Sequence, residues 1–228
     1  MVDSSVGGKT AINHPLGKNL LGAFWQPRLV LADTDVLQTL PRSERISALA
    51  EIIKYGVIAD AAFFAWLEAN ITSVRDLEPA ALAHAVKRSC EVKAFVVGND
   101  ERESGLREIL NFGHTIGHAI ENAAGYGEFR HGEAIAIGMI AEAALALGRE
   151  PGWTAESQAR LRALIGRAGL PTALPSDSTL TPAALLDAAR SDKKNRAGAV
   201  RYVIPKRIGE VFTRKFSDAE VEPVLKGE

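Results

Sequence analysis

Three histidines fall close together in the sequence and offer ligands for a metal ion. His114 and His118 lie four residues apart, and His131 follows within the same stretch of 18 positions. Neutral imidazoles with a carboxylate suit Zn2+ or a similar divalent ion, and three protein ligands with an open position are typical of a catalytic site. Either His114 or His118 could pair with His131, so the spacing leaves the ligand pair open.

The segment around His114 has the pattern of a helix over 106–124. At about 100° per residue, its polar side chains gather on one stripe and its apolar ones on the opposite face. Gly113 and Gly117 weaken a helix relative to alanine, so we expect another backbone or a ligand to lie close to them. A solvent-exposed amphipathic helix is the alternative. The polar stripe holds Arg107, Asn111, His114, His118 and Glu121.

Glu51 is a candidate carboxylate, but its own neighbourhood does not single it out. It precedes Lys54 by three residues on the predicted helix, on the side away from the apolar positions. Such pairs are most often exposed and contribute only ~0.2–0.5 kcal/mol. The pattern alone therefore favours a surface ion pair.

Two short motifs could hold an anion. Gly7-Gly8-Lys9-Thr10 lacks the first glycine of a phosphate-binding P-loop, because Asp3 occupies that position, although backbone N–H groups with Lys9 and Lys18 could still bind an anion. The run Asp192-Lys193-Lys194 could clamp a phosphate or carboxylate. An ordinary glycine turn and a solvated charged loop are the alternatives.

The periodicity of apolar residues predicts a mainly α protein. The apolar run 28–33 reads as a strand, and alternation over 200–212 predicts a β-hairpin. Ser43 is the expected cap of the first helix, and the helix 132–148 is apolar nearly all round and should be buried. The predicted helices are 41–56, 59–70, 78–97, 106–124, 132–148, 154–168, 182–190 and 217–225.

Composition excludes several classes of protein. The 228 residues carry 27 Lys+Arg against 28 Asp+Glu, so a broad basic surface for nucleic acid is not expected. The longest apolar stretch, 134–141, is far shorter than the ~20 residues of a membrane-spanning helix, so no membrane partner is expected. The single Cys90 cannot form an intrachain disulfide, which favours a cytoplasmic location.

Several longer motifs occur together and in a fixed order along the chain. In sequence letters they are DSSVGGKTAINHPLGKNLLGAF (3–24), DTDVLQTLP (33–41), AEIIKYG (50–56), EVKAFVVGNDERESGLREILNFGHTIGHAIE (91–121), HGEAIAIGM (131–139) and DKKNRAGAVRYVIP (192–205). In these motifs the sequence resembles the 3-dehydroquinate synthase family. The matching stretches span nearly the whole chain.

The resemblance implies a two-part enzyme, with an N-terminal α/β domain that binds NAD and a C-terminal helical domain that holds the metal and the substrate. Residues 1–40 would be a strand-containing remnant of the junction with the NAD-binding domain, and 41–228 the helical domain. Most of the NAD-binding half would then lie outside this sequence. We therefore expect the chain alone to be inactive, with impaired NAD binding.

The resemblance also assigns roles to residues. It implies Glu51, His114 and His131 as ligands of Zn2+ or Co2+, which decides the two questions that spacing leaves open. Positions at the NAD site would be Lys9, Lys18, Val36, Leu37, Gln38 and Thr39. Substrate-pocket positions would be Asp3, Asn19, Lys54, Lys93, Arg107, Asn111, His118 and one of Lys193 or Lys194.

The reaction implied by the resemblance converts 3-deoxy-D-arabino-heptulosonate 7-phosphate, a seven-carbon sugar acid phosphate, to 3-dehydroquinate and phosphate in the shikimate pathway of aromatic amino acid biosynthesis. NAD oxidises the substrate transiently, phosphate leaves, the intermediate is reduced again, and the ring closes. The partner would thus be an anionic small molecule. A homodimer is one expected assembly, because surface left by the missing domain could promote self-association.

Two other functions remain open on the sequence. The chain could belong to a related sugar phosphate cyclase or a metal-dependent polyol dehydrogenase of similar architecture. It could also be a non-catalytic fragment that folds as a helical binding module, which would bind metal without NAD.

Overall fold

The computed structural model describes residues 1–228 except 15–16, 102–104, 126, 192–199 and 228. The described chain is mainly helical, as predicted, and has two separate two-stranded antiparallel sheets. The strands are β1 (Lys9–His14), β2 (Gly17–Phe24), β3 (Val200–Arg207) and β4 (Glu210–Phe216). The helices are α1 (Arg42–Ala59), α2 (Ala61–Arg75), α3 (Pro79–Asn99), α4 (His114–Ala124), α5 (His131–Ala144), α6 (Ala155–Ala168), α7 (Pro182–Ser191) and α8 (Asp218–Lys226), with the 3-10 helices η1 (Thr34–Thr39) and η2 (Leu106–Asn111).

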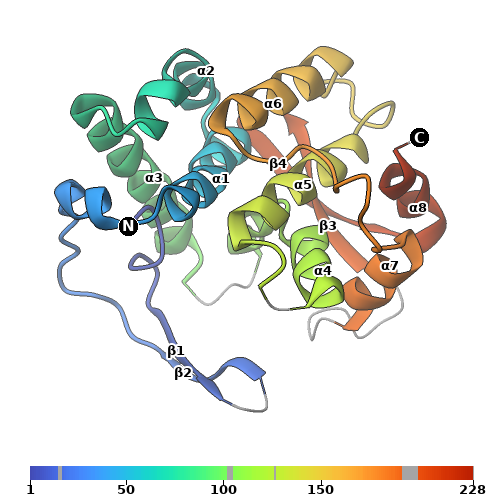
Figure 1. The fold of residues 1–228 in the computed structure, drawn as a ribbon, viewed down its shortest axis with the longest axis horizontal. Helices are drawn as coiled ribbons and strands as arrows, with labels where there is room; N and C mark the ends of the chain where they lie inside the picture. Colours follow the sequence, from blue (N-terminus) through green and yellow to red (C-terminus); the bar gives the residue numbers. More distant parts are fainter. Residues whose placement is uncertain (15–16, 102–104, 126, 192–199, 228) are drawn as a thin grey trace.

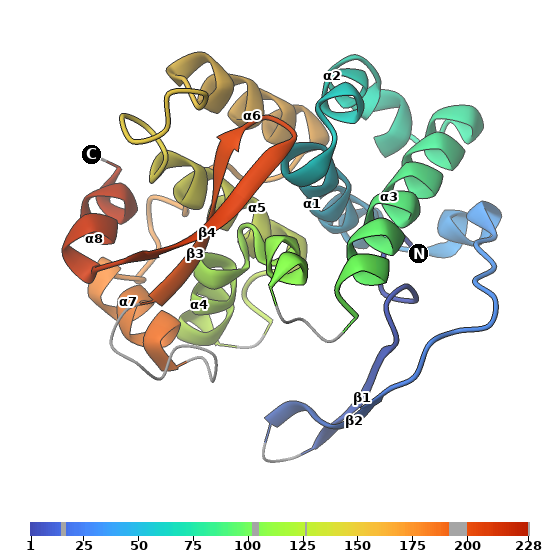
Figure 2. The same cartoon turned by 180° about the vertical axis from the view of Figure 1, so that it is seen from behind.

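Helix α1 runs through the middle of the helical body. It packs against α2 and α3 on one side and against α5 and α6 on the other (Figure 1). The β3–β4 hairpin lies across the back of these helices, where it contacts α1 and α5 (Figure 2). Every helix in the described ranges is too short or too polar to cross a lipid bilayer.

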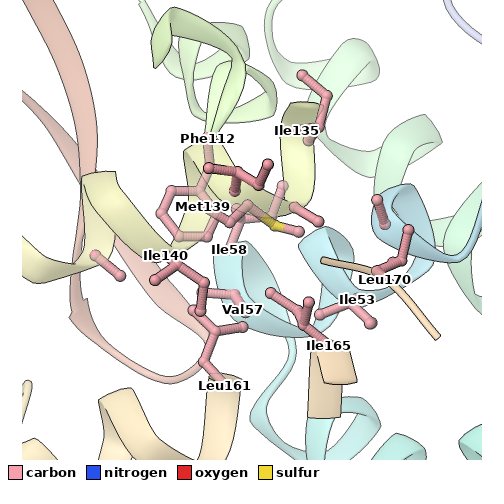
Figure 3. Close-up of a cluster of buried hydrophobic side chains, with 14 of the residues drawn as sticks. Ile53, Val57, Ile58, Phe112, Ile135, Met139, Ile140, Leu161, Ile165 and Leu170 are labelled. Atoms are coloured by element: carbon pink, nitrogen blue, oxygen red, sulfur yellow. The ribbon is translucent and has the colours of Figure 1, made fainter. Parts of the chain in front are cut away.

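The hydrophobic core gathers around α1 and α5. Ile53 and Val57 of α1 meet Ile135 and Met139 of α5, and Ile165 of α6 closes the cluster (Figure 3). All five side chains are fully removed from solvent. Burying each such side chain contributes about 1.5–3 kcal/mol, so this cluster fixes α1 and α5 against each other.

The prediction of a single strand at 28–33 is wrong. Strands β1 and β2 pair as an antiparallel hairpin, with Lys9 opposite Phe24, in a region where the sequence predicted no strand. The run 28–33 forms no strand in the described structure, and Leu29 and Leu31 are 81% and 86% exposed. An apolar run becomes a strand only where a neighbour can accept its hydrogen bonds, and the hairpin pairs with itself instead.

The predicted helix over 106–124 is broken in two. The 3-10 helix η2 ends at Asn111, and Gly113, with φ of +79°, lies in the left-handed region before α4 begins at His114. Arg107 and Asn111 therefore do not share a helix face with His114, and the predicted stripe is wrong for those two residues. A glycine adopts this backbone conformation without the steric cost of a Cβ.

Helix α1 begins without the predicted serine cap. Ser43 lies inside its first turn, whereas Pro41 precedes the helix and makes no side-chain capping bond. Glu44 places a negative charge in the first turn, where it interacts favourably with the helix dipole. The helix also continues past the predicted end at Gly56 to Ala59.

Glycines let α5 approach two other helices at backbone distance. A Cβ on Gly132 would lie 1.8 Å from the carbonyl oxygen of Ser47 in α1, and one on Gly138 would lie 2.0 Å from that of Gly113. A Cβ on Gly117 would meet Ile135 of α5 in the same way. The expectation that Gly113 and Gly117 lie against another backbone is thus confirmed.

Replacing Gly138 by alanine tests this contact. A methyl group at 2.0 Å from the Gly113 carbonyl forces α4 and α5 apart, and such overpacking costs about 1–3 kcal/mol. We expect Gly138→Ala to lower the free energy of unfolding by that amount in urea denaturation. Gly166→Ala in α6 is the control, because its Cβ meets nothing within 4 Å; it should be neutral or stabilising, and equal effects of the two changes would contradict the packing account.

Glu142 joins α5 to α4 from inside the core. Its side chain is fully buried, and its two carboxylate oxygens accept hydrogen bonds from the backbone N–H groups of Gly113 (2.9 Å) and Ile116 (3.2 Å). Burial raises the pKa of Glu142 to about 8, although these N–H groups act in the opposite direction. The folded protein thus holds a proton that the unfolded chain releases near pH 4.5.

This shift predicts a pH dependence of stability. Between the ordinary pKa of 4.5 and the folded value of about 8, the native state binds more protons than the unfolded state, so the free energy of unfolding should fall as pH rises. We expect Glu142→Gln to remove this component, measured as a difference between the two urea-unfolding curves from pH 5 to 8. Parallel pH profiles for the parent and the variant would contradict it.

Candidate metal centre

Glu51, His114 and His131 come together from three helices. Glu51 lies in the middle of α1, whereas His114 and His131 are the first residues of α4 and α5. Glu51 Oε1 lies 3.3 Å from His114 Nε2 and 3.6 Å from His131 Nε2. One ligand atom from each residue lies within 4.8 Å of the others, so all three can reach a common point.

The packing of the helices explains this meeting. Gly132 follows His131 directly, and its N–H donates to Ser47 Oγ at 2.9 Å. Ser47 lies one turn before Glu51 on α1, so the contact brings the start of α5 beside the carboxylate. Gly113 likewise places the start of α4 against α5. Backbone contacts next to both histidines therefore set the geometry of the centre.

The outer nitrogens of both imidazoles have partners. His114 Nδ1 lies 3.0 Å from the carbonyl oxygen of Phe112, which accepts from an Nδ1–H and leaves Nε2 directed at Glu51. His131 Nδ1 lies 3.1 Å from Glu121 Oε2. Ligand histidines in metalloproteins commonly donate their second N–H to a carbonyl or carboxylate in this way.

A second possible ligand group overlaps the first. His118, Glu121 and His131 also bring ligand atoms within 4.8 Å of one another. Neutral His131 has one lone pair to offer, so it cannot serve an ion on both sides. The centroid of the His118 ring lies 5.4 Å from that of His114 and 5.9 Å from that of His131.

Charge is concentrated at Glu51. Burial would raise the pKa of Glu51, but the positive charge of Lys54 and the contacts with His114 hold it well below its ordinary value. Lys54 is 3% exposed and forms an ion pair with Glu51, so the expected exposed surface pair is in fact buried. Burial lowers the pKa of His131, but its hydrogen bonds with Glu121 and Glu51 outweigh that effect and raise it to about 9.

The donor set fits a divalent ion such as Zn2+. It consists of two imidazole nitrogens and one carboxylate, a common ligand set for zinc in catalytic sites. Within the described part of the chain, Glu51 Oε2 is buried and makes no hydrogen bond, although Lys54 Nζ lies beside it. An ionised carboxylate with incomplete hydrogen bonding is suited to a cation.

A second polar cluster joins the N-terminal segment to the helical body. Lys93 of α3 donates to the backbone oxygen of Asp3 and lies 3.4 Å from Asp3 Oδ2. Tyr55, next to Lys54, donates a hydrogen bond from its hydroxyl to Asp3 Oδ2 at 3.1 Å. Burial lowers the pKa of Lys93, and the charge of Asp3 opposes this shift.

Tyr55 was not among the predicted site residues. A tyrosine inside an apolar helix pattern looks like an ordinary core residue, and its side chain is indeed fully buried. The signal that could have found it is its hydroxyl, because a buried phenol needs a hydrogen-bond partner.

Arg107 lies in a different place from the one that the helical stripe predicted. It is only 2% exposed and donates to the carbonyl oxygens of Gly7 (2.9 Å) and Glu101 (2.6 Å). It therefore fastens the glycine turn of the N-terminal segment to η2. Asn111, at the end of η2, is partly buried.

The predicted NAD-site residues and Asn19 lie in the N-terminal hairpin and in η1, and not in the helices that carry the three ligands. Lys9 lies in β1, and Lys18 and Asn19 in β2, of a hairpin that projects from the helical body (Figure 1). Val36, Leu37, Gln38 and Thr39 lie in η1, which contacts α3, and Leu37 packs on the core. Lys193 and Lys194 lie outside the described residues.

Comparison with known families matches the chain along most of its length. A family model described as 3-dehydroquinate synthase C-terminal matches residues 48–195. A second, described as 3-dehydroquinate synthase N-terminal, matches residues 1–47.

Curated relatives agree with this result. The 3-dehydroquinate synthases of Bordetella pertussis (strain Tohama I) and Bordetella parapertussis (strain 12822) are each 52% identical to the chain over 225 residues. These alignments cover 99% of this chain and 62% of each relative. The chain thus spans about 62% of the length of the relatives it matches.

Two solved structures have the same fold. ValA, a 2-epi-5-epi-valiolone synthase from Streptomyces hygroscopicus subsp. jinggangensis 5008 with NAD+ and Zn2+ bound, gives a TM-score of 0.87 at 29% identity, over 99% of this chain and 62% of its own. A 2-deoxy-scyllo-inosose synthase complexed with carbaglucose-6-phosphate, NAD+ and Co2+ gives 0.85 at 26% identity, over 99% and 64%. With the two family models covering residues 1–195 and the identity of 52%, these matches show that the chain belongs to the 3-dehydroquinate synthase family.

Proposed function

We propose that this chain provides the metal- and substrate-binding part of a 3-dehydroquinate synthase, which converts 3-deoxy-D-arabino-heptulosonate 7-phosphate to 3-dehydroquinate and phosphate. The observation that carries the proposal is the meeting of Glu51, His114 and His131 within 4.8 Å of one another. The identity of 52% to 3-dehydroquinate synthases supports this reaction over those of the two solved cyclases, which are 29% and 26% identical.

Glu51, His114 and His131 are the proposed ligands of Zn2+ or Co2+, the ions in the two related structures. When bound, such an ion supplies a positive charge that lowers the pKa of a substrate hydroxyl and so favours its oxidation. Glu121 holds His131 through Nδ1, and the Phe112 carbonyl holds His114 in the same way. The proposed role of His118, whose ring lies near those of His114 and His131, is to orient a hydroxyl or carry a proton.

Cationic side chains are the proposed contacts for a substrate that carries a carboxylate and a phosphate. Lys54 is adjacent to the metal ligands, and Lys93 holds the N-terminal segment at Asp3. The guanidinium of Arg107 uses two of its five N–H donors on the carbonyls in the described structure, which leaves donors for an anion. Asn111, Asn19 and one of Lys193 or Lys194 complete the proposed substrate positions.

The proposed contribution of this chain to an NAD site comes from the N-terminal hairpin and η1. Lys9 and Lys18 lie on the hairpin strands, and 36–39 form most of η1. Both solved relatives have NAD+ bound, and this chain covers 62% and 64% of their lengths. The remaining length of those proteins is therefore expected to supply the other contacts to the cofactor.

Removal of single ligands tests the metal site. Zn2+ added to metal-free protein should raise the melting temperature, because binding to the native state alone stabilises it. We expect Glu51→Ala, His114→Ala and His131→Ala each to abolish that increase in thermal unfolding followed by circular dichroism. His84→Ala is the matched control, since His84 lies on the exposed face of α3 and its ring contacts that of Trp66. An undiminished zinc effect in all three ligand variants would defeat the assignment.

Product analysis tests the reaction. The chain, joined to the part of the Bordetella pertussis relative that it does not cover, should form 3-dehydroquinate from the seven-carbon substrate in the presence of NAD and Zn2+. The same chimera with His114→Ala should lose this activity. Cyclisation of a different sugar phosphate, with no turnover of the seven-carbon acid, would instead favour a related cyclase.

A further inference from the structure

The start of α4 is stabilised by a residue of another helix. The first N–H groups of a helix have no partner within the helix and need an acceptor. The residue at the capping position of α4 is Gly113, which has no side chain and provides no cap. Glu142 of α5 takes this role, because its two oxygens accept from Gly113 N and Ile116 N.

This contact lies directly behind a proposed metal ligand. Gly113 and Ile116 flank His114 in sequence, and both are held by the same carboxylate. The His114 ring is in turn fixed by the Phe112 carbonyl, one residue before Gly113. A shift of the Gly113 backbone would therefore move both His114 and the group that orients its ring.

A polar side chain in this position needs a reason. Glu142 is fully removed from solvent, in a helix whose other inward residues include Ile135 and Met139. Burying a carboxyl group is costly unless hydrogen bonds compensate for the lost water. The neighbouring glycine contacts bring α4 and α5 together, and the two directed hydrogen bonds to Glu142 hold the first turn of α4 in place.

We propose that Glu142 is a positioning residue that sets the orientation of His114 toward Glu51 through the first turn of α4. The inference rests on the proposed metal site, and it adds a residue that contacts neither the ion nor the substrate. Helix α5 would then contribute two residues to the metal centre: the ligand His131 at its start, and the positioning residue Glu142 three turns later.

Zinc affinity of variants tests this role. Glu142→Leu keeps the approximate volume but offers no acceptor, whereas Glu142→Gln keeps one oxygen. Loss of a group that supports a ligand typically weakens metal affinity about 10- to 100-fold, so we expect that loss for Leu. For Gln we expect a dissociation constant about two- to tenfold weaker, as loss of one hydrogen bond implies. Calorimetry with Zn2+ measures both.

The control separates positioning from general loss of stability. Val221→Ala removes a buried side chain from α8, which carries none of the proposed ligands, and it should leave zinc affinity unchanged. The visible absorption of bound Co2+ and the NMR resonance of His114 Nδ1–H should change in the Glu142 variants and not in Val221→Ala. Equal losses of affinity in Glu142→Leu and Val221→Ala would overturn the inference.

The outcomes distinguish the two proposals. If the parent protein fails to bind Zn2+, the proposed metal site itself is wrong. If the parent binds Zn2+ and both Glu142 variants match its affinity and its spectra, only the positioning role is overturned. If Glu142→Leu does not fold, as judged by circular dichroism, Glu142→Gln decides: parent values for affinity and for the His114 resonance would overturn the role.

Discussion

The close approach of α5 to α1 and α4 is the constraint on which the candidate site depends. At Gly132 and Gly138 there is no space for a Cβ, because backbone atoms of α1 and of the turn before α4 occupy it. Helices with larger side chains at their contact lie about 8–10 Å apart. The glycines permit a closer approach at the first residue of α5 and at the first residue of α4, which are the two histidines. Their imidazoles can then reach the same carboxylate of α1.

The electrostatics of the centre follow from that geometry. Glu51 is carried into the interior by a helix that is apolar on its other sides, and an ionised carboxylate there requires compensation. Lys54 supplies a charge one turn away, and the histidines supply contacts from the other two helices. Hydrogen bonds with Glu121 and Glu51 outweigh the effect of burial and raise the pKa of His131 to about 9, which favours its protonated form. A metal ion at the proposed site would compete with a proton for the same ring nitrogen.

Regular patterns in the sequence were sufficient to predict most of the helices. The periodicity over 154–168 and 182–190 predicted α6 and α7 to within one residue, and the alternation after Val200 predicted the β3–β4 hairpin, although β4 continues beyond 212 to Phe216. The break before His114 was missed, since a glycine in a helical pattern does not reveal its dihedral angles. Glu51 could be selected only by family resemblance, because its burial depends on α4 and α5. Glu142 gave no sequence signal, because its role lies in hydrogen bonds to a distant segment, and for Tyr55 the only signal was a hydroxyl within an apolar helix pattern.

Because the helix is broken at Gly113, the side chains of η2 and α4 do not follow one continuous helical repeat. In one continuous helix, Arg107 and His114 would point in nearly the same direction, since seven residues make close to two full turns. Here η2 directs Arg107 toward the N-terminal glycine turn while α4 directs His114 toward α1 and α5. Changes in the length of η2 can thus be absorbed without turning the imidazole, whereas an insertion after His114 would rotate His118 by about 100°. The segment that looks most uniform in the sequence is therefore two units that can vary independently.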